Sequence, residues 1–210
     1  MIYYQIIGGS PFGQNCRIYV NEVTKEAAIS DPGASARAIA QMIDKNGLTL
    51  KAILLTHMHI DHVGGAKELC ELTGAKIFGS AIEDALLMEN FSTQASMLGL
   101  ENPGFFETQY LCDNEVFTPI SDMELKVIST PGHTPGGICF YCEKEKFLIS
   151  GDTLFEGSVG RTDFPLGSTE ALINSIKEKL FALPDDTRVL CGHGPDTSIG
   201  EEKLHNPYIY

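Results

Sequence analysis

The chain has 210 residues, of which 43% are hydrophobic and 20% charged, the balance of an ordinary globular protein. Its net charge of −13 disfavours nucleic acid as a partner, because neutralising phosphates requires clustered Lys and Arg. The first twelve residues lack the basic and apolar regions of a signal peptide, and no apolar run approaches the about 20 residues of a membrane span. We therefore expect a single domain over residues 1–210, a cytoplasmic location, and neither a membrane nor a nucleic-acid partner.

The first half of the chain predicts short strands followed by alternating helices and strands. Three β-like runs come first, with Gly, Pro or Asn between them, at residues 2–7, 16–21 and 26–30. Helices are then predicted over 35–45, 62–73 and 82–89, with strands between them over 51–56 and 75–79. Periodicity is lost over 90–106, where Gly and Pro accumulate. We expect a loop or broken helix there, near the mouth of a site, and the sequence leaves open whether it forms a lid.

The second half predicts a series of strands, then one helix and a last strand. The strand-like segments are residues 115–118, 123–129, 137–142, 147–150 and 188–191. Ser168 is predicted to cap the N-terminus of a helix over 169–181. Because strands and helices alternate in two loosely repeated halves, we expect two packed sheets with helices on the outside.

The six cysteines are expected to be reduced, because the chain shows no secretory signal and is large enough to build a core. Cys139 and Cys142 have CxxC spacing, but they lie in an apolar run typical of a strand. Residues three apart on a strand point to opposite faces, so a shared metal or a redox pair is not expected. We interpret both as small core residues.

Four potential metal ligands lie within six residues, at the junction between a predicted strand and a predicted helix: His57, His59, Asp61 and His62. The carboxyl end of a strand is a favoured ligand position in layered αβ folds. Imidazole and carboxylate ligands suit zinc or iron. His57 and His59 can reach one ion from the same face of an extended turn, whereas Asp61 and His62 would turn toward a second ion.

Three further candidates occur in the same context, each after an apolar run and each flanked by glycine or proline: His133, Asp152 and His193. Small flanking residues let the backbone turn tightly close to an ion. Either histidine alone would be interpreted as an ordinary loop residue. The repetition of strand end, tight turn and ligand instead predicts that all seven residues meet at one site. His205 lies outside this pattern and is expected at the surface.

In order and approximate spacing, these seven residues resemble the ligand pattern of the metallo-β-lactamase superfamily. The resemblance implies an α/β fold, a four-layer αββα sandwich in which two mixed β-sheets carry helices on their outer faces. It also implies two divalent cations, for which zinc is expected and iron or manganese stays open. The first would be held by His57, His59 and His133, the second by Asp61, His62 and His193, and Asp152 would bridge them.

Two adjacent cations lower the pKa of a bridging water, which gives hydroxide near neutral pH. The site therefore predicts a hydrolase with no need for a serine or cysteine nucleophile. One ion can also polarise the scissile carbonyl. Asp61 is the expected catalytic residue, because it can both bind the second ion and orient the attacking hydroxide.

Residues 151–155, 130–134 and 192–195 resemble glyoxalase II, which hydrolyses S-lactoylglutathione, and residues 160–165 resemble its short bacterial branch. The chain departs from the full-length enzyme in two ways: it ends about where a C-terminal glutathione-binding domain would start, and Arg161-Thr162-Asp163 replaces a Lys-Phe-Tyr run. Arg161 is a candidate for binding a substrate carboxylate, and a structural ion pair with Asp163 is an equal alternative. The expected partner is a small molecule, such as a glutathione thioester; the oligomeric state and the physiological substrate stay open.

Other functions are weaker fits to the sequence. The Gly-Arg-Thr-Asp-Phe stretch also resembles persulfide dioxygenases, which use one iron held by the equivalents of His57, His133 and Asp152. A β-lactamase is not expected, because the chain shows no export signal and Asp152 stands where secreted zinc enzymes often use Cys. A non-catalytic metal-binding or redox partner protein is the alternative of another class, but a structural site would be closed and four-coordinate. We favour thioester hydrolysis.

Overall fold

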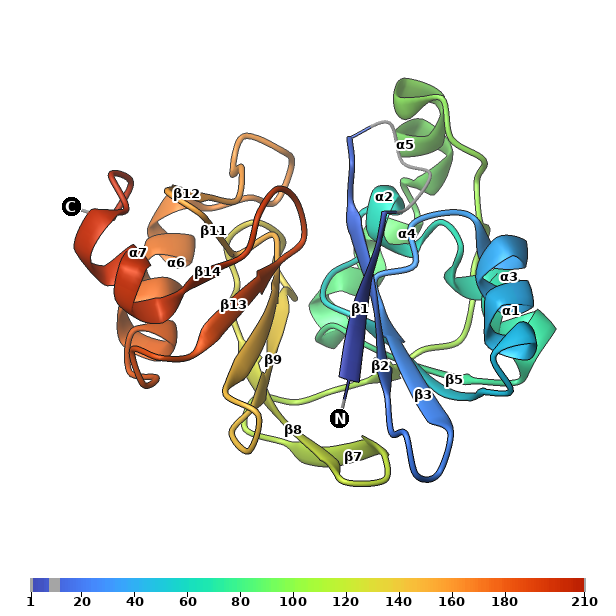
Figure 1. Ribbon diagram of the computed structural model, residues 1–210. Coiled ribbons are helices and arrows are strands. Elements are labelled where there is room, and N and C mark those ends of the chain that lie inside the picture. The colour runs from blue at the N-terminus through green and yellow to red at the C-terminus, as the bar shows by residue number, and fades with distance from the viewer. Residues whose placement is uncertain (1, 8–11, 210) are drawn as a thin grey trace.

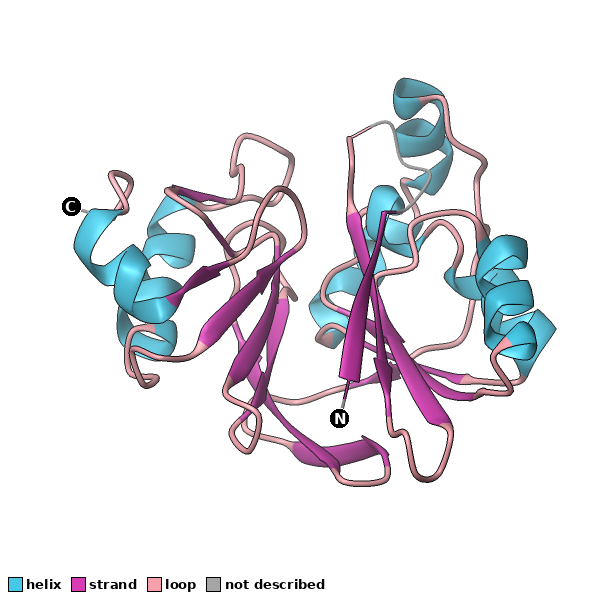
Figure 2. Ribbon diagram, in the orientation of Figure 1, coloured by secondary structure: helices cyan, strands magenta, loops and turns pink. Residues whose placement is uncertain are grey.

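Residues 2–7 and 12–209 are described by a computed structural model, residues 2–7 by their backbone alone. Two six-stranded sheets lie face to face, and helices cover the outer face of each (Figure 1). Figure 2 shows most helices gathered at the two sides of the molecule with the strands between them. The order of layers is helix, sheet, sheet, helix, as the sequence predicts.

The first sheet is formed by the N-terminal half of the chain in sequential order: β1 (Ile2–Ile7), β2 (Asn15–Val20), β3 (Glu26–Ser30), β4 (Thr49–Leu55), β5 (Lys76–Gly79) and β6 (Gln109–Tyr110). Strands β1 to β3 pair antiparallel, and β3 to β6 pair parallel, so the sheet is mixed. Parallel neighbours place their carboxyl ends at one edge, and β4 therefore delivers Thr56 and His57 to the edge next to the β3 end.

The second sheet has the order β14-β13-β10-β9-β8-β7. Its strands are β7 (Val116–Ile120), β8 (Met123–Ser129), β9 (Ile138–Cys142), β10 (Phe147–Gly151), β13 (Arg188–Cys191) and β14 (Thr197–Ser198). Only β10 and β13 pair in parallel within it, so this sheet is also mixed. A short hairpin of two strands with two residues each, β11 (Leu154–Phe155) and β12 (Ser158–Val159), follows β10.

The helices divide between the two outer faces and the edge of the first sheet. Helices α1 (Ala36–Lys45) and α3 (Ala66–Thr73) pack on the first sheet. The second sheet carries α6 (Thr169–Asn174), the π-helical turn η2 (Ser175–Leu180) and α7 (Ile199–His205). The remaining helices are short: α2 (Ile60–Val63), η1 (Ile82–Asp84), α4 (Ala85–Met88) and α5 (Phe91–Leu98). None of the described helices combines the length and the apolar character that crossing a bilayer requires.

Strand β4 reads as a continuous apolar run because both of its faces are covered. Ala52 and Leu54 face the second sheet, where they join the central apolar layer. Ile53 and Leu55 face the opposite way, toward α1 and α3. Burial on both sides fixes the register of the strand, and hence the position of the residues that follow it.

Strand β9 confirms the prediction for the CxxC pair. Cys142 belongs to the layer between the sheets, and Cys139 to the layer under α6 and η2. All six cysteines are free thiols, and burial raises the pKa of Cys139 to about 11. Neither residue is therefore placed to share a metal or a disulfide with the other.

Two predicted segments differ in detail from the structure, and one helix was not predicted. The helix expected over 62–73 is two helices, because Gly64 and Gly65 lie between α2 and α3 where the chain passes the backbone of Gly33 and Pro32. The segment 90–106, expected to be a loop or broken helix, contains the helix α5 over 91–98, which ends at Gly99 with a φ of 66° and is followed by irregular chain. Helix α7 was not expected, although Ser198 caps it by accepting a hydrogen bond from Glu201 N.

Candidate metal centre

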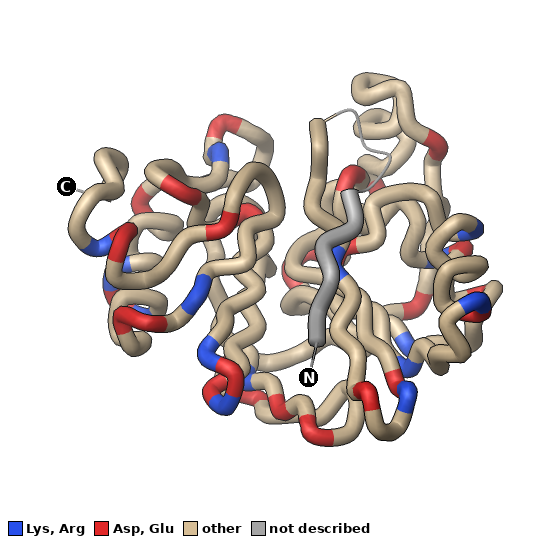
Figure 3. The backbone as a smooth tube through the Cα atoms, in the orientation of Figure 1, with Lys and Arg blue, Asp and Glu red and all other residues tan. Residues whose placement is uncertain are grey.

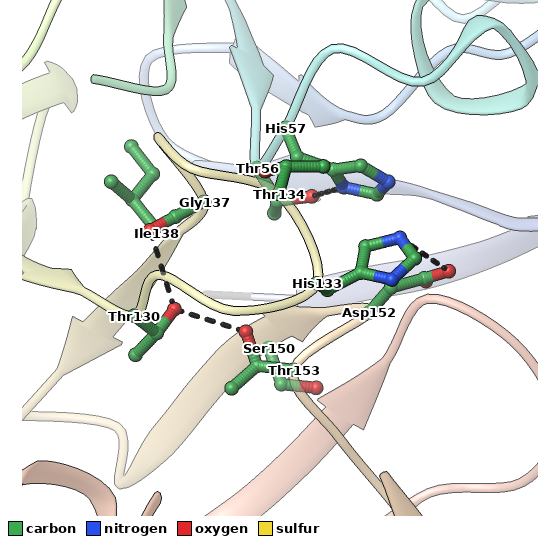
Figure 4. Close-up of a pocket in the computed structure, with 10 residues that line it drawn as sticks. All are labelled: Thr56, His57, Thr130, His133, Thr134, Gly137, Ile138, Ser150, Asp152 and Thr153. Carbon is green, nitrogen blue, oxygen red and sulfur yellow. Dashed lines mark hydrogen bonds and ion pairs between the residues drawn. The ribbon is translucent and has the colours of Figure 1, made fainter. Parts of the chain in front are cut away.

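The seven predicted ligands meet at one edge of the two sheets. His57 follows β4, His59 precedes α2, and Asp61 and His62 lie in α2. His133, Asp152 and His193 follow β8, β10 and β13 of the second sheet. Figure 4 shows His57, His133 and Asp152 facing one another across this edge. Their donor atoms form three overlapping groups, each within 4.8 Å: His57–His59–His133, His57–His62–Asp152 and Asp61–His62–His193.

The first group places three imidazoles around one point. His59 Nδ1 and His133 Nε2 lie 2.9 Å apart, and the ring of His57 packs edge-on against both rings. His57 Nε2 is buried and has no hydrogen-bond partner among the described residues. A buried nitrogen lone pair without a partner is costly, and a bound cation would satisfy it. The residues present therefore fit a metal ion at this position.

Asp61, His62 and His193, called the second group from here on, combine two imidazoles with a carboxylate. His62 Nε2 and His193 Nε2 are 3.2 Å apart, and His193 Nε2 is 3.4 Å from Asp61 Oδ2. Asp152 reaches both groups, since its Oδ1 lies 3.2 Å from His62 Nε2 and its Oδ2 lies 3.6 Å from His133 Nε2. Two adjacent ions could share this one carboxylate.

In three of the histidine rings, a hydrogen bond to Nδ1 determines which ring nitrogen is free to bind a metal ion. His133 Nδ1 donates to the Arg161 carbonyl at 2.7 Å, and His193 Nδ1 donates to the Phe12 carbonyl at 3.1 Å, because a carbonyl can only accept. The Thr56 hydroxyl donates to Asp31 Oδ2, so the bond of 3.0 Å between Thr56 Oγ1 and His57 Nδ1 must be donated by the ring. In each ring the proton sits on Nδ1, and the Nε2 lone pair faces the site.

Burial and neighbouring charges give the metal-free histidines and Asp152 different protonation states. Burial lowers the pKa of His57 well below its usual range and the pKa of His59 to about 3. Burial also opposes ionisation of Asp152, but His62 and His133 outweigh it and hold the pKa of this carboxyl well below its usual range. Burial likewise opposes the charge on His62, yet Asp152 and Asp61 raise its pKa well above the usual range. At the first position His57 and His59 are therefore neutral, and Asp152 is ionised.

A family model described as the metallo-beta-lactamase superfamily matches residues 10–193. The chain belongs to the metallo-β-lactamase superfamily. The αββα sandwich expected from the sequence is confirmed by this match and by the fold itself. The matched range contains all seven clustered histidines and aspartates.

Several proteins of the superfamily resemble the chain over nearly its whole length. A Haemophilus influenzae protein described as hydroxyacylglutathione hydrolase GloC is 41% identical, over 98% of this chain and 97% of its own. The crystal structure of the BLEG-1 B3 metallo-beta-lactamase has a TM-score of 0.90 and 36% identity, with 99% of each chain covered. A di-iron-bound form of TTHA1623 has a TM-score of 0.86 and 33% identity, over 98% of this chain and 99% of that chain.

Two buried aspartates that support this superfamily site were not among the predicted residues. Asp31 follows β3, accepts hydrogen bonds from the Thr56 N–H and hydroxyl, both at 2.8 Å, and lies 3.2 Å from His62 Nδ1. Its Asp-Pro-Gly context after a strand repeats the pattern of the ligands and could have identified it. Asp84 lies in η1, where nothing in the sequence distinguishes it from a helix-surface residue.

Arg161 lies next to the site but is already paired. Its Nε and Nη2 donate to the two oxygens of Asp163 at 3.0 and 2.8 Å, as the structural alternative predicted. Its guanidinium also stacks 4.5 Å over the ring of Phe164. Phe164 in turn lies 5.5 Å from the His59 ring, so this loop forms a wall of the first group. His205 is exposed and 3.7 Å from Glu201, outside the cluster, as expected.

Proposed function

We propose that the chain is a dinuclear metal-dependent hydrolase that cleaves acyl thioesters of the S-acylglutathione type. The observation that carries the proposal is the convergence of seven histidine and aspartate donors, in which Asp152 lies 3.2 Å from His62 of the second group and 3.6 Å from His133 of the first. Two adjacent groups provide for two ions, and a hydrolytic site needs positions that protein donors do not fill. The substrate class is supported by the 41% identity to the protein described as hydroxyacylglutathione hydrolase GloC.

The proposed assignment gives the first ion to His57, His59 and His133, the second to Asp61, His62 and His193, and Asp152 to both. Two divalent cations bound there would supply hydroxide at neutral pH by lowering the pKa of a water between them. The donors are nitrogen and oxygen atoms without a thiolate, a set that suits zinc, iron or manganese. We expect zinc, and the di-iron form of TTHA1623 makes iron the second metal to test.

The protein's own groups orient the reactants in this proposal. Asp61 is largely buried, and although burial opposes its ionisation, His62 and His193 hold its pKa below the usual range. It therefore stays ionised at neutral pH, where it can accept a hydrogen bond from the attacking water and aim it. The ring of Phe164 lies against the rings of His59 and His133, where it would limit the access of water to one side of the first group.

The function is tested by assaying the metal-loaded protein with S-lactoylglutathione and other acyl thioesters while the metal per chain is counted. Two ions per chain with thioester turnover are expected. One iron per chain with persulfide-dependent oxygen uptake would instead establish the dioxygenase. Tight metal binding with no turnover of any substrate would establish a non-catalytic metal protein.

Replacing His59 by Ala removes one donor of the first group. We expect kcat/KM for thioesters to fall by at least about 100-fold, since loss of even a supporting residue in such sites costs 10–100-fold. The far-UV circular dichroism should be unchanged, because His59 belongs to no apolar layer. His205→Ala is the matched control and should keep full activity. Undiminished thioester hydrolysis by His59→Ala would contradict the proposed metal centre.

Hydrolysis of β-lactams is the second candidate, and one observation favours it. BLEG-1, described as a B3 metallo-beta-lactamase, has a TM-score of 0.90 and matches 99% of both chains. A chromogenic cephalosporin assayed beside the thioesters separates the two functions. A kcat/KM for the cephalosporin above that for every thioester would replace the thioesterase proposal.

A further inference from the structure

Asp84 is a fully buried carboxylate that lies between the ligand loops of the two sheets. It ends η1, beside the ligands of the first group, and none of its surface is exposed. It is not one of the seven clustered donors, and the proposed mechanism does not use it. A charge buried at this depth persists only where hydrogen bonds compensate its lost hydration.

Three donors from two loops compensate Asp84. Its Oδ2 accepts the Met58 N–H at 3.0 Å and the Thr134 hydroxyl at 3.0 Å. Its Oδ1 accepts the Gly136 N–H at 2.6 Å. Met58 stands between His57 and His59, and Thr134 directly follows His133. One carboxylate therefore joins the backbone that carries two histidines of the first group to the turn that carries the third.

The packing at this junction leaves no room for a side chain at Gly136. A Cβ added at Gly136 would lie 2.7 Å from the Ala81 carbonyl oxygen and 2.9 Å from Asp84 Oδ1. The Ala81 N–H also donates to the Gly136 carbonyl at 2.8 Å, so η1 and the His133 turn are joined on both sides of Asp84. The β8–β9 turn is thus held at a fixed distance from the β4–α2 loop.

The contacts of Asp84 do not extend to the second group. Asp31 touches both groups, since it lies 3.2 Å from His62 Nδ1 and accepts the hydroxyl of Thr56 beside His57. None of the contacts of Asp84 described above involves Asp61, His62 or His193, so a change at Asp84 acts directly on the first group alone.

We propose that Asp84 is the positioning residue of the first metal site: it holds His57, His59 and His133 at the separation that one ion requires, and so sets the affinity for that ion. The proposal rests on the ligand assignment above and is independent of the substrate.

The test titrates the metal-free variants with zinc and resolves the two equivalents by chelator competition. In Asp84→Asn the side chain keeps its shape, but an N–H replaces one acceptor and faces a donor. We expect the affinity for one equivalent to fall about 10–100-fold, the range for supporting residues at metal sites. The other equivalent should change less than about threefold. Glu83→Gln, which replaces an exposed carboxylate in the same turn, should bind both equivalents of zinc with wild-type affinity.

A second readout is spectroscopic. Cobalt bound to the first site should show altered visible absorption in Asp84→Asn and an unchanged spectrum in Glu83→Gln. Thr134→Val removes a single bond to Asp84 and should give a smaller loss of the same equivalent, which keeps the proposal testable if Asp84→Asn folds poorly.

Wild-type affinity for both equivalents in Asp84→Asn, or an equal loss of both in Asp84→Asn and Thr134→Val, would overturn the positioning role. Both measurements are made without substrate. A protein that hydrolyses no thioester would therefore defeat the proposed function and leave this result standing.

Discussion

At the scale of single residues, Arg161 shows how a candidate contact depends on its neighbours. The Arg161 side chain is 67% exposed and forms a bidentate ion pair with Asp163. Its guanidinium also lies over the ring of Phe164, which packs beside His59 of the first group. An exposed pair of this kind stabilises a protein by at most about 1 kcal/mol, so a substrate carboxylate could replace Asp163 at little cost. Its role in substrate binding stays a prediction.

Arg161→Met keeps a long side chain over Phe164 and removes the charge. If Arg161 binds a carboxylate of the substrate, KM for S-lactoylglutathione should rise about 10-fold, the effect of losing about 1.4 kcal/mol, while kcat stays within about twofold. An acyl thioester without carboxylates should be unaffected. Arg37→Met, a remote exposed pair with Glu68, is the control. Equal KM values for both variants would assign Arg161 to the structural ion pair alone.

The candidate ligands could be identified from the sequence because each follows an apolar run, or belongs to the short motif at 57–62 that follows one, and strand ends of this kind can be recognised locally. Asp84 was not, because its partners lie 26, 50 and 52 residues away. A hydrogen bond between distant segments leaves no periodic trace in the sequence. Thr56 was likewise unnoticed as the residue that sets the His57 tautomer, since its role appears only when Asp31 of a neighbouring strand is beside it.

At the scale of elements, the turn after β3 packs against α2 more closely than any side chain would allow. A Cβ added at Gly33 would lie 1.6 Å from the Asp61 carbonyl oxygen. The approach lets Asp31 reach Thr56 and His62, so the geometry of α2 depends on this contact.

Gly33→Ala should therefore separate the turn from α2 and lower the free energy of unfolding by about 2–3 kcal/mol, as overpacking does in close contacts. Urea unfolding followed by circular dichroism measures it. Gly200→Ala, whose new Cβ would meet exposed Asp185 at 3.0 Å, is the control and should change stability by less than about 1 kcal/mol. Equal stabilities would show that the turn relaxes freely.

Strands β3, β8 and β13 were predicted with their observed bounds for two different reasons. In β8 (Met123–Ser129) buried and exposed residues alternate over its first five positions, whereas β3 and β13 are short apolar runs that are buried almost throughout. The extent of α5 was not predicted, because its only buried residues are Phe91 and Ala95. The two-residue strands β6, β11, β12 and β14 are too short to carry a pattern and exist only through their partners.

At the scale of the whole molecule, the sequence could predict two sheets but not their pairing from periodicity alone. The order of both sheets, and the parallel pairing of β10 with β13, join segments far apart in the chain. The resemblance to the superfamily implied two mixed sheets in a sandwich, but not the order of their strands. A single domain over 1–210 and a cytoplasmic location stay predictions. Acidic and basic residues are distributed along the backbone of both halves (Figure 3).

Buried titratable groups predict that the metal-free protein loses stability in acid. Burial depresses the pKa of His57 and His59, so below about pH 6.5 the unfolded chain binds two protons that the folded chain does not. Burial raises the pKa of Asp84 to about 6, which returns one proton to the folded chain below that pH. His62 is protonated in both states there. With one excess proton in the unfolded chain, the free energy of unfolding should fall by about 1.4 kcal/mol per pH unit from about pH 6 to pH 4.

Urea midpoints of the chelator-treated protein between pH 7 and 4 measure this slope. Zinc-loaded protein is the comparison and should hold its stability further into the acid range, because binding to the folded state alone adds stability. A metal-free protein whose stability rises as the pH falls through this window would contradict the assigned protonation states.

Under the proposed assignment, each ion draws its ligands from both sheets, and this has a consequence for synthesis of the chain. His59 meets His133 across 74 positions, and His62 meets His193 across 131. While the ribosome is still making the second sheet, the motif at 57–62 is an incomplete chelator with no partner loop to close it. The ligands of the first ion are complete once Asp152 has been made, whereas those of the second ion are complete only after translation of His193. The two ions can therefore be bound at different stages of synthesis.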